Sequence, residues 1–204
     1  MRALVLVDLQ YDFMPGGALA VAHGDEVVPV AQQLITKFDW VIATQDWHPR
    51  DHASFAVNNP GTEVNQLIEL DGLPQVMWPA HCVQGTRGAE LHEGIDKRKI
   101  SAVFRKGLDP YIDSYSGFHD NGHRKATGLG DWLAEKKITR LWVMGLATDY
   151  CVKYTVLDAR QLGLEVTLVR DGCRPVELAP GDGERAIAEM RAAGASCATS
   201  DAVR

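Results

Sequence analysis

The most informative part of the sequence is the stretch LWVMGLATDYCV, which occupies residues 141–152. It opens with a short apolar run, which is typical of a strand that is buried on both faces. A turn that contains Gly145 follows, and residues 149–162 then predict a helix that ends before Gly163. A strand, a tight turn and a helix in this order are typical of an α/β fold with a parallel sheet.

The same alternation extends along the chain in both directions. Apolar runs predict five more strands, of which the last is the weakest, at residues 3–7, 40–44, 100–104, 166–169 and 195–199. Amphipathic segments predict further helices at residues 25–38, 127–137 and 183–193. Since strands that alternate with helices form parallel sheets covered on both faces, we expect an α/β fold in three layers. The chain shows no repeat or linker, and we expect a single domain over residues 1–204.

Composition excludes several classes of protein. The 204 residues carry a net charge of −6, with 46% hydrophobic and 24% charged residues, which is typical of a globular protein. The acidic balance and the lack of clustered Lys and Arg argue against nucleic acid as a partner. No apolar run approaches the ~20 residues of a membrane span, and no signal peptide is evident. We therefore expect a cytoplasmic protein without a membrane partner, in which the four cysteines are reduced.

Residues 46–99 interrupt the alternation with a long segment rich in His, Asn, Pro and Gly, in which we expect at most one short helix. Long ordered loops in compact domains are usually functional, and parallel sheets place ligands beyond the carboxyl ends of their strands. Asp46 and His48 follow the second strand and point the same way in an extended chain. With His81 they predict a metal site that leaves positions open and suits zinc, iron or manganese. The alternative is that these are hydrogen-bonded loop residues.

Three further strand ends carry reactive side chains. Asp8 closes the first strand, where partial burial would raise its pKa and favour proton transfer. Lys106 follows the third strand and could stabilise a thiolate. Cys151 falls in the first turn of a predicted helix, whose free N–H groups would lower the pKa of the thiol, with Thr148 or Asp149 as the N-cap. A structural carboxylate, a surface lysine and a buried core cysteine are the alternatives.

Taken together, these residues and their surroundings resemble the nicotinamidases of the isochorismatase-like cysteine hydrolase superfamily. The similarity runs over nearly the whole chain, and it is carried by VDLQYDF (7–13), DWHP (46–49), WPAHCVQGT (78–86), YSGF (115–118) and GLATDYCV (145–152). The cysteine motif and Asp8 indicate the superfamily. The D-x-H pair with W-P-x-H-C indicates nicotinamidase, since many relatives lack the metal site.

The resemblance implies a Rossmann-like, isochorismatase-like fold with a six-stranded, largely parallel sheet in an α-β-α arrangement. It implies hydrolysis of nicotinamide to nicotinate and ammonia in NAD salvage, and hydrolysis of pyrazinamide as well. Asp8, Lys106 and Cys151 would form the catalytic triad, and the N–H groups of Ala147 and Cys151 the oxyanion hole. The peptide bond between Leu146 and Ala147 would be cis.

The resemblance also implies one divalent metal ion and a pocket for a planar ring. Asp46, His48 and His81 would bind the metal, and His52 would be a fourth ligand or lie behind the others. The residues expected to contact the substrate are Phe13, Leu19, Val21, Trp78, Tyr115 and Leu146. The partner is then a small molecule, nicotinamide, and the chain could act as a monomer or a homo-oligomer.

Two other functions are alternatives to nicotinamide hydrolysis. A cysteine amidohydrolase of the same superfamily that acts on a carbamoyl or ureido compound would generally lack the D-x-H and His81 set. A non-catalytic nucleotide-binding module would need a glycine-rich phosphate loop, and the sequence contains neither G-x-G-x-x-G nor a Walker motif.

Overall fold

The computed structural model describes all 204 residues, and its centre is a six-stranded sheet with the order β5-β2-β1-β6-β7-β8. Every pair of neighbouring strands in it is parallel. The six strands predicted from the sequence are all present, as β1 (Arg2–Val7), β2 (Val41–Asp46), β5 (Ala102–Lys106), β6 (Arg140–Leu146), β7 (Glu165–Arg174) and β8 (Ser196–Ala198). The prediction of a six-stranded parallel sheet is therefore confirmed.

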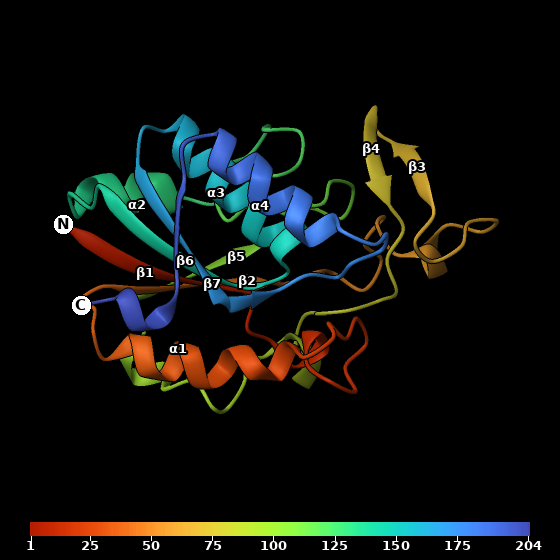
Figure 1. Cartoon of the computed structure of the whole chain (residues 1–204). Helices are drawn as coiled ribbons and strands as arrows, with labels where there is room; N and C mark the ends of the chain where they lie inside the picture. Colours follow the sequence, from red (N-terminus) through yellow and green to blue (C-terminus); the bar gives the residue numbers. More distant parts are fainter.

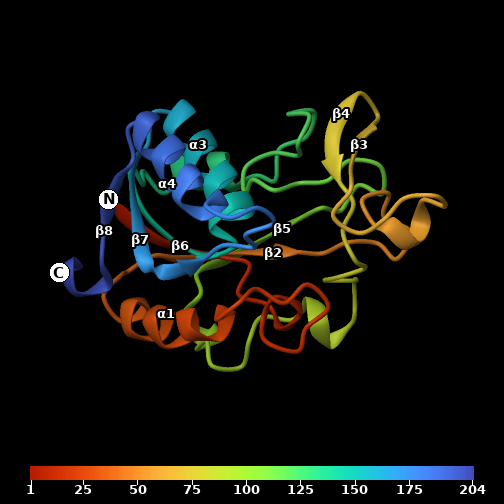
Figure 2. The same ribbon diagram turned by 45° about the vertical axis from the view of Figure 1, so that its right-hand side comes forward.

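Helices cover both faces of this sheet, as Figures 1 and 2 show. The helix α1 (Val27–Ile35) packs on one face, and α2 (Leu129–Glu135), α3 (Lys153–Gln161) and α4 (Asp182–Ala192) lie on the other. The apolar stripe of α1 includes Val27, Ala31 and Leu34, which are fully buried. Because β1, β2 and β6 are covered from both sides, their residues are almost all buried. The three-layer prediction is confirmed.

The strand order reverses beside β1, and this determines where a ligand can bind. The chain passes from β1 to β2 and β5 on one side, and then returns to β6 on the other side of β1. The connections that follow β1 and β6 therefore diverge and leave a crevice at the carboxyl ends of the strands. The long segment between β2 and β5 lies at this same end of the sheet (Figure 1).

That segment contains a hairpin that the sequence analysis did not predict. The strands β3 (Leu67–Leu70) and β4 (Leu73–Val76) pair in antiparallel fashion and stand apart from the main sheet (Figures 1 and 2). Asp71 and Gly72 connect them with φ angles of 52° and 77°. An Asp-Gly pair between two short runs is a strong signal for such a turn, so the hairpin was predictable. The expected short helix is instead represented by single 3₁₀ turns, such as Ala56–Asn58 and Arg87–Ala89.

The start of the helix after β6 also differs from the prediction. Residues Thr148–Val152 form a π-helical turn that precedes α3, and Ala147 takes the N-cap position. Neither Thr148 nor Asp149 caps this turn with its side chain, which corrects the predicted N-cap. The Asp149 carboxylate instead accepts hydrogen bonds from the backbone N–H groups of Val176 and Glu177, at 2.8 and 2.9 Å. Asp149 thus ties the turn to the loop after β7.

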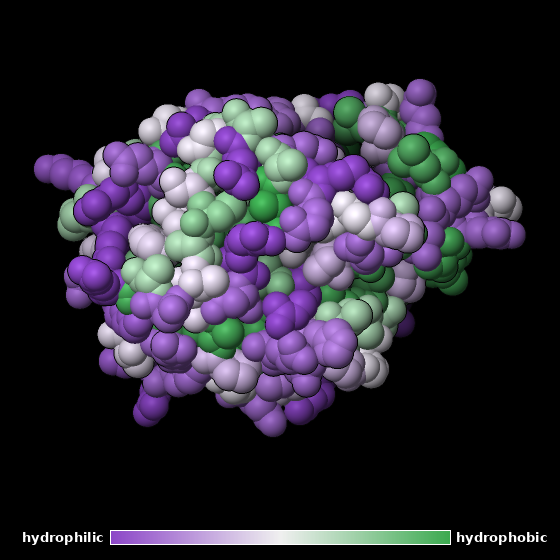
Figure 3. Space-filling view, viewed as in Figure 1, coloured by the Kyte–Doolittle hydropathy of each residue, from purple (hydrophilic) through white to green (hydrophobic).

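The molecular surface is mostly hydrophilic on the side seen in Figure 3, with apolar side chains scattered among polar ones. None of the helices has both the length and the apolar character that a bilayer crossing requires.

Candidate active site

Lys106 lies at the centre of the residues gathered at the carboxyl ends of the strands. The register of β2 and β5 pairs Asp46 with Lys106, which places the two side chains next to each other. The Lys106 Nζ donates to Asp46 Oδ1 at 2.5 Å and to the Ser114 carbonyl at 2.9 Å, and it lies 2.9 Å from Asp8 Oδ2. Burial opposes the charge on this side chain, but the carboxylates of Asp46 and Asp8 outweigh it and raise the pKa of Lys106. The site therefore holds a permanent buried cation.

Asp8 ends β1 in a left-handed backbone conformation, with a φ of 51°, and its side chain is fully buried. Burial raises the pKa of Asp8 to about 6, against the opposing effect of the Lys106 charge and a hydrogen bond from the Thr44 hydroxyl. Thr44 Oγ1 donates to Asp8 Oδ1 at 2.7 Å. Since the pKa lies below neutral pH, Asp8 is mostly ionised at pH 7 and can accept a proton.

Cys151 reaches this centre from the π-helical turn, with its Sγ 3.3 Å from Lys106 Nζ. Its sulfur, Asp8 and Asp46 offer atoms that all lie within 4.8 Å of one another. The expectation of a lowered thiol pKa is corrected by the structure. Burial raises the pKa of Cys151 well above its ordinary value, since Lys106 opposes this effect only in part and the Asp8 and Asp46 carboxylates add to it. The resting sulfur therefore keeps its proton, and a base must remove it.

The backbone around Cys151 leaves a donor free for a negative charge. The Leu146–Ala147 peptide bond is cis, as the resemblance implied. The Ala147 carbonyl accepts hydrogen bonds from Tyr150 and Val152, while the Ala147 N–H donates to no group of the protein backbone. An unused N–H next to a buried sulfur is the arrangement that an oxyanion hole requires.

Asp46, His48 and His81 come together as one possible metal-binding group, and all three are buried. His48 Nδ1 lies 3.0 Å from the Gly107 carbonyl and His81 Nδ1 lies 2.8 Å from the Pro79 carbonyl. Because a carbonyl only accepts, each Nδ1 carries a hydrogen, and the Nε2 of the neutral imidazole is the atom that can bind a metal. These Nε2 atoms lie 3.7 and 3.9 Å from the same oxygen, Asp46 Oδ2.

The charges of this group fit a cation. His48 Nε2 is buried without a hydrogen-bond partner, which is costly unless something binds it. Burial, followed by the nearby His48, lowers the pKa of His81 to about 4, so its imidazole is neutral and can act as a ligand. Gly107 adopts a φ of +65°, and a side chain there would collide with the His48 ring. The residues present therefore fit a divalent metal ion.

His52 and Asp113 lie behind this group. The structure groups His52 with His48 and Asp113, and not with Asp46 and His81. His52 Nδ1 lies 2.8 Å from the Ser54 hydroxyl, and its ring stands 4.5 Å from that of His48. Asp113 was missed in the sequence because it lies in a loop well beyond the end of β5, where no spacing marks it.

A small cavity of about 20 Å³ opens beside Cys151 and the metal-binding group. Four of the six residues expected to contact substrate line it, namely Phe13, Leu19, Trp78 and Tyr115. Tyr150, Asp113 and Val176 also line it and were not predicted, whereas Val21 and Leu146 lie in the hydrophobic core instead.

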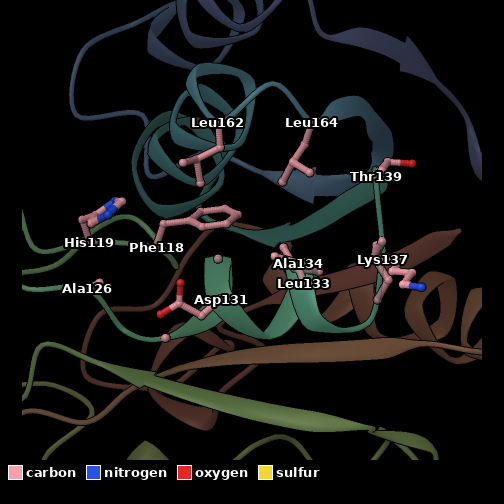
Figure 4. Close-up of a pocket in the computed structure, with 13 residues that line it drawn as sticks. Phe118, His119, Ala126, Asp131, Leu133, Ala134, Lys137, Thr139, Leu162 and Leu164 are labelled. Carbon is pink, nitrogen blue, oxygen red and sulfur yellow. The ribbon is translucent and has the colours of Figure 1, made fainter.

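A larger cavity of about 470 Å³ lies elsewhere, beside α2, and is shown in Figure 4. Its lining is largely apolar, with Phe118, Leu133 and Leu162 among its walls. It gathers no set of reactive side chains like the one around Lys106.

Comparison with known proteins gives consistent matches over the full fold. Residues 2–202 match the model of the isochorismatase domain. The chain is 55% identical over 205 residues to a nicotinamidase of Escherichia coli, covering 97% of this chain and 94% of that protein. A solved Acinetobacter nicotinamidase/pyrazinamidase superposes with a TM-score of 0.95 at 43% identity, covering 98% of this chain and 96% of the other.

A second solved structure bears on the metal-binding group. The pyrazinamidase of Pyrococcus horikoshii, determined in complex with zinc, superposes with a TM-score of 0.81 at 37% identity. The match covers 97% of this chain and 98% of that one.

Proposed function

The chain belongs to the isochorismatase domain family, and from this premise we propose that it hydrolyses nicotinamide to nicotinate and ammonia, a reaction of NAD salvage. Its similarity to enzymes named nicotinamidase and pyrazinamidase supports this reaction and the hydrolysis of pyrazinamide. One observation carries the proposal. The Lys106 ammonium lies within 3.3 Å of Cys151 Sγ and 2.9 Å of Asp8 Oδ2, beside a buried two-histidine, one-carboxylate group.

In the first step, Asp8 takes the proton from the Cys151 thiol as the sulfur attacks the carboxamide carbon. This division of roles follows from the two pKa values, since Asp8 is ionised at pH 7 and the thiol is not. A carbon–sulfur bond forms and the carbonyl oxygen becomes negative. Lys106 stays protonated throughout and stabilises the charge that develops on sulfur and on Asp8.

The oxyanion is held by the N–H groups of Ala147 and Cys151. A donor of this kind is typically worth ~10²–10³ in rate. As the tetrahedral intermediate collapses, the carbon–nitrogen bond breaks, and the proton held by Asp8 passes to the departing ammonia. Water then hydrolyses the thioester, with Asp8 again accepting a proton, and the Cys151 thiol is restored.

Asp46, His48 and His81 would hold the metal ion, which we propose to be zinc because a relative was determined in complex with that metal. When bound, the ion supplies a Lewis acid that can coordinate the ring nitrogen of the pyridine. With the ion held by these residues, the ring would be positioned so that the carboxamide lies over Cys151, and positioning of this kind can lower a barrier by several kcal/mol. His52 and Asp113, which lie beside His48, would help to hold the metal ligands in place.

A nicotinamide hydrolysis assay with and without a chelator tests this function. We expect equal amounts of ammonia and nicotinate from the metal-loaded protein, and a large loss of activity after chelation that added zinc restores. A parallel assay with a carbamoyl compound separates the alternative amidohydrolase. Turnover of that compound but not of nicotinamide would overturn the proposal.

A further inference from the structure

A second group of two histidines and an aspartate lies outside the site described above. His119 and His123 belong to the loop between β5 and α2, and Asp158 belongs to α3. His119 Nδ1 lies 3.5 Å from Asp158 Oδ2, and His123 Nε2 lies 3.5 Å from Asp158 Oδ1. The three residues offer ligand atoms that all lie within 4.8 Å of one another. The group therefore has the same donors as Asp46, His48 and His81.

The atoms of this second group lack partners within the protein. His119 Nδ1 and Asp158 Oδ2 are both buried and neither makes a hydrogen bond. Asp158 as a whole is only 5% exposed. A buried carboxylate oxygen and a buried ring nitrogen that face each other without a hydrogen bond are costly. A cation between them would satisfy both.

The spacing of the group fits a small metal ion. Two ligands held at ~2.0–2.1 Å from a tetrahedral zinc lie about 3.3 Å apart. In this group, His119 Nδ1 and His123 Nε2 each lie 3.5 Å from a different oxygen of Asp158, close to that value. The two imidazole rings, which belong to the same loop, stack with their centroids 4.9 Å apart and their planes 15° from parallel.

The surroundings leave the group accessible and free of competing positive charge. Arg124 and Lys125 lie next to His123 in sequence, but their side chains pair with Asp71 and Asp109. The nearby Asp120 carboxylate is used by backbone N–H groups of its own loop. The His123 side chain is 52% exposed, which opens a path for an ion and for water as a further ligand. His119 also stands at the edge of the apolar cavity in Figure 4.

We propose that His119, His123 and Asp158 form a second metal site, for zinc or a similar divalent transition ion. Two nitrogen donors and one carboxylate suit these metals better than calcium or magnesium. The ion would clamp the loop to α3. The loop and α3, which the ion would join, are both connected to the catalytic centre. The Ser114 carbonyl in the same loop accepts a hydrogen bond from Lys106, and Asp158 lies about two helical turns after Cys151.

Equilibrium dialysis against zinc chloride, with bound zinc counted by elemental mass spectrometry, tests this site without any activity assay. We expect H119N and H123N each to bind one zinc per chain fewer than the wild type. H23N is the matched control, since His23 is also a surface histidine beside a carboxylate, at 3.0 Å from Glu26, but has no third ligand. H23N should bind as much zinc as the wild type.

A second measurement separates this site from the first one. In the H81N background, added zinc should still raise the Tm, and this rise should disappear in the H81N/H123N double variant. The histidine variants are used because Asp158→Asn alters a buried residue. Equal zinc content in the wild type, H119N and H123N would overturn the proposal, whatever the nicotinamide assay shows.

Discussion

Thr44 gives the sharpest test of the role assigned to Asp8. Its hydroxyl donates to Asp8 Oδ1 at 2.7 Å, and both side chains are fully buried. Thr44→Val keeps the shape of the side chain and removes the donor. A hydrogen bond to a charged group is worth ~1.5–3 kcal/mol, and one pKa unit corresponds to ~1.4 kcal/mol. Loss of this bond should therefore raise the pKa of Asp8 from about 6 by at least about one unit.

The sign of the effect on catalysis follows from the need for an ionised Asp8. A higher pKa leaves more of the base protonated, so activity is lost on the acidic side. With a pKa near 7 in place of about 6, the ionised fraction at pH 6 falls from about one half to about one tenth. At pH 8 it stays above about nine tenths in both proteins.

The assay is the pH dependence of kcat/KM for nicotinamide, which reports the pKa values of the free enzyme. Thr44→Val should lose about five-fold at pH 6 and little at pH 8, and its acidic limb should move up by about one pH unit. Thr44→Ser keeps the hydroxyl and should retain the wild-type profile. An unmoved acidic limb in Thr44→Val would refute the assignment of Asp8 as the titrating base.

Three further outcomes are expected. Lys106→Met leaves the Asp8 and Asp46 carboxylates buried without their cation, so it should lower the free energy of unfolding in urea by ~3–5 kcal/mol and kcat by ~10²-fold or more. The control Lys99→Met, at an exposed lysine outside the site, should do neither, and a fully active Lys106→Met would contradict the role assigned to Lys106. His81→Asn should lower the metal content and raise the KM for nicotinamide, while an unchanged metal content would remove His81 from the ligands. Asp149→Ala leaves the N–H groups of Val176 and Glu177 without their acceptor and should cost ~1–3 kcal/mol in urea unfolding; an unchanged midpoint would show that this contact contributes nothing.

The order of strands and helices could be predicted because the apolar runs are short and amphipathic segments separate most of them. The positions of Asp8, Asp46, Lys106 and Cys151 could also be anticipated, since parallel strands place their carboxyl ends at one edge. These side chains do converge in the structure. Their individual assignments as catalytic and metal-binding residues stay predictions until the variants are measured.

Other features depend on contacts between distant parts of the chain. Burial of its sulfur raises the pKa of Cys151, Lys106 from another strand opposes this effect in part, and the carboxylates of Asp8 and Asp46 add to it. Tyr150 and Asp113 reach the cavity from a π-helical turn and a loop, where no periodicity marks them. The β3–β4 hairpin is different, because the Asp71-Gly72 pair is itself a local turn signal in the sequence.

The most direct test of the central claim is the hydrolysis of nicotinamide by Cys151→Ser, measured beside Cys197→Ser. Both variants replace one thiol with a hydroxyl, but only Cys151 lies against Lys106 and the cavity. We expect Cys197→Ser to release ammonia and nicotinate at the wild-type rate and Cys151→Ser to release neither. Substantial turnover by a folded, metal-loaded Cys151→Ser would contradict the role of Cys151 as the nucleophile.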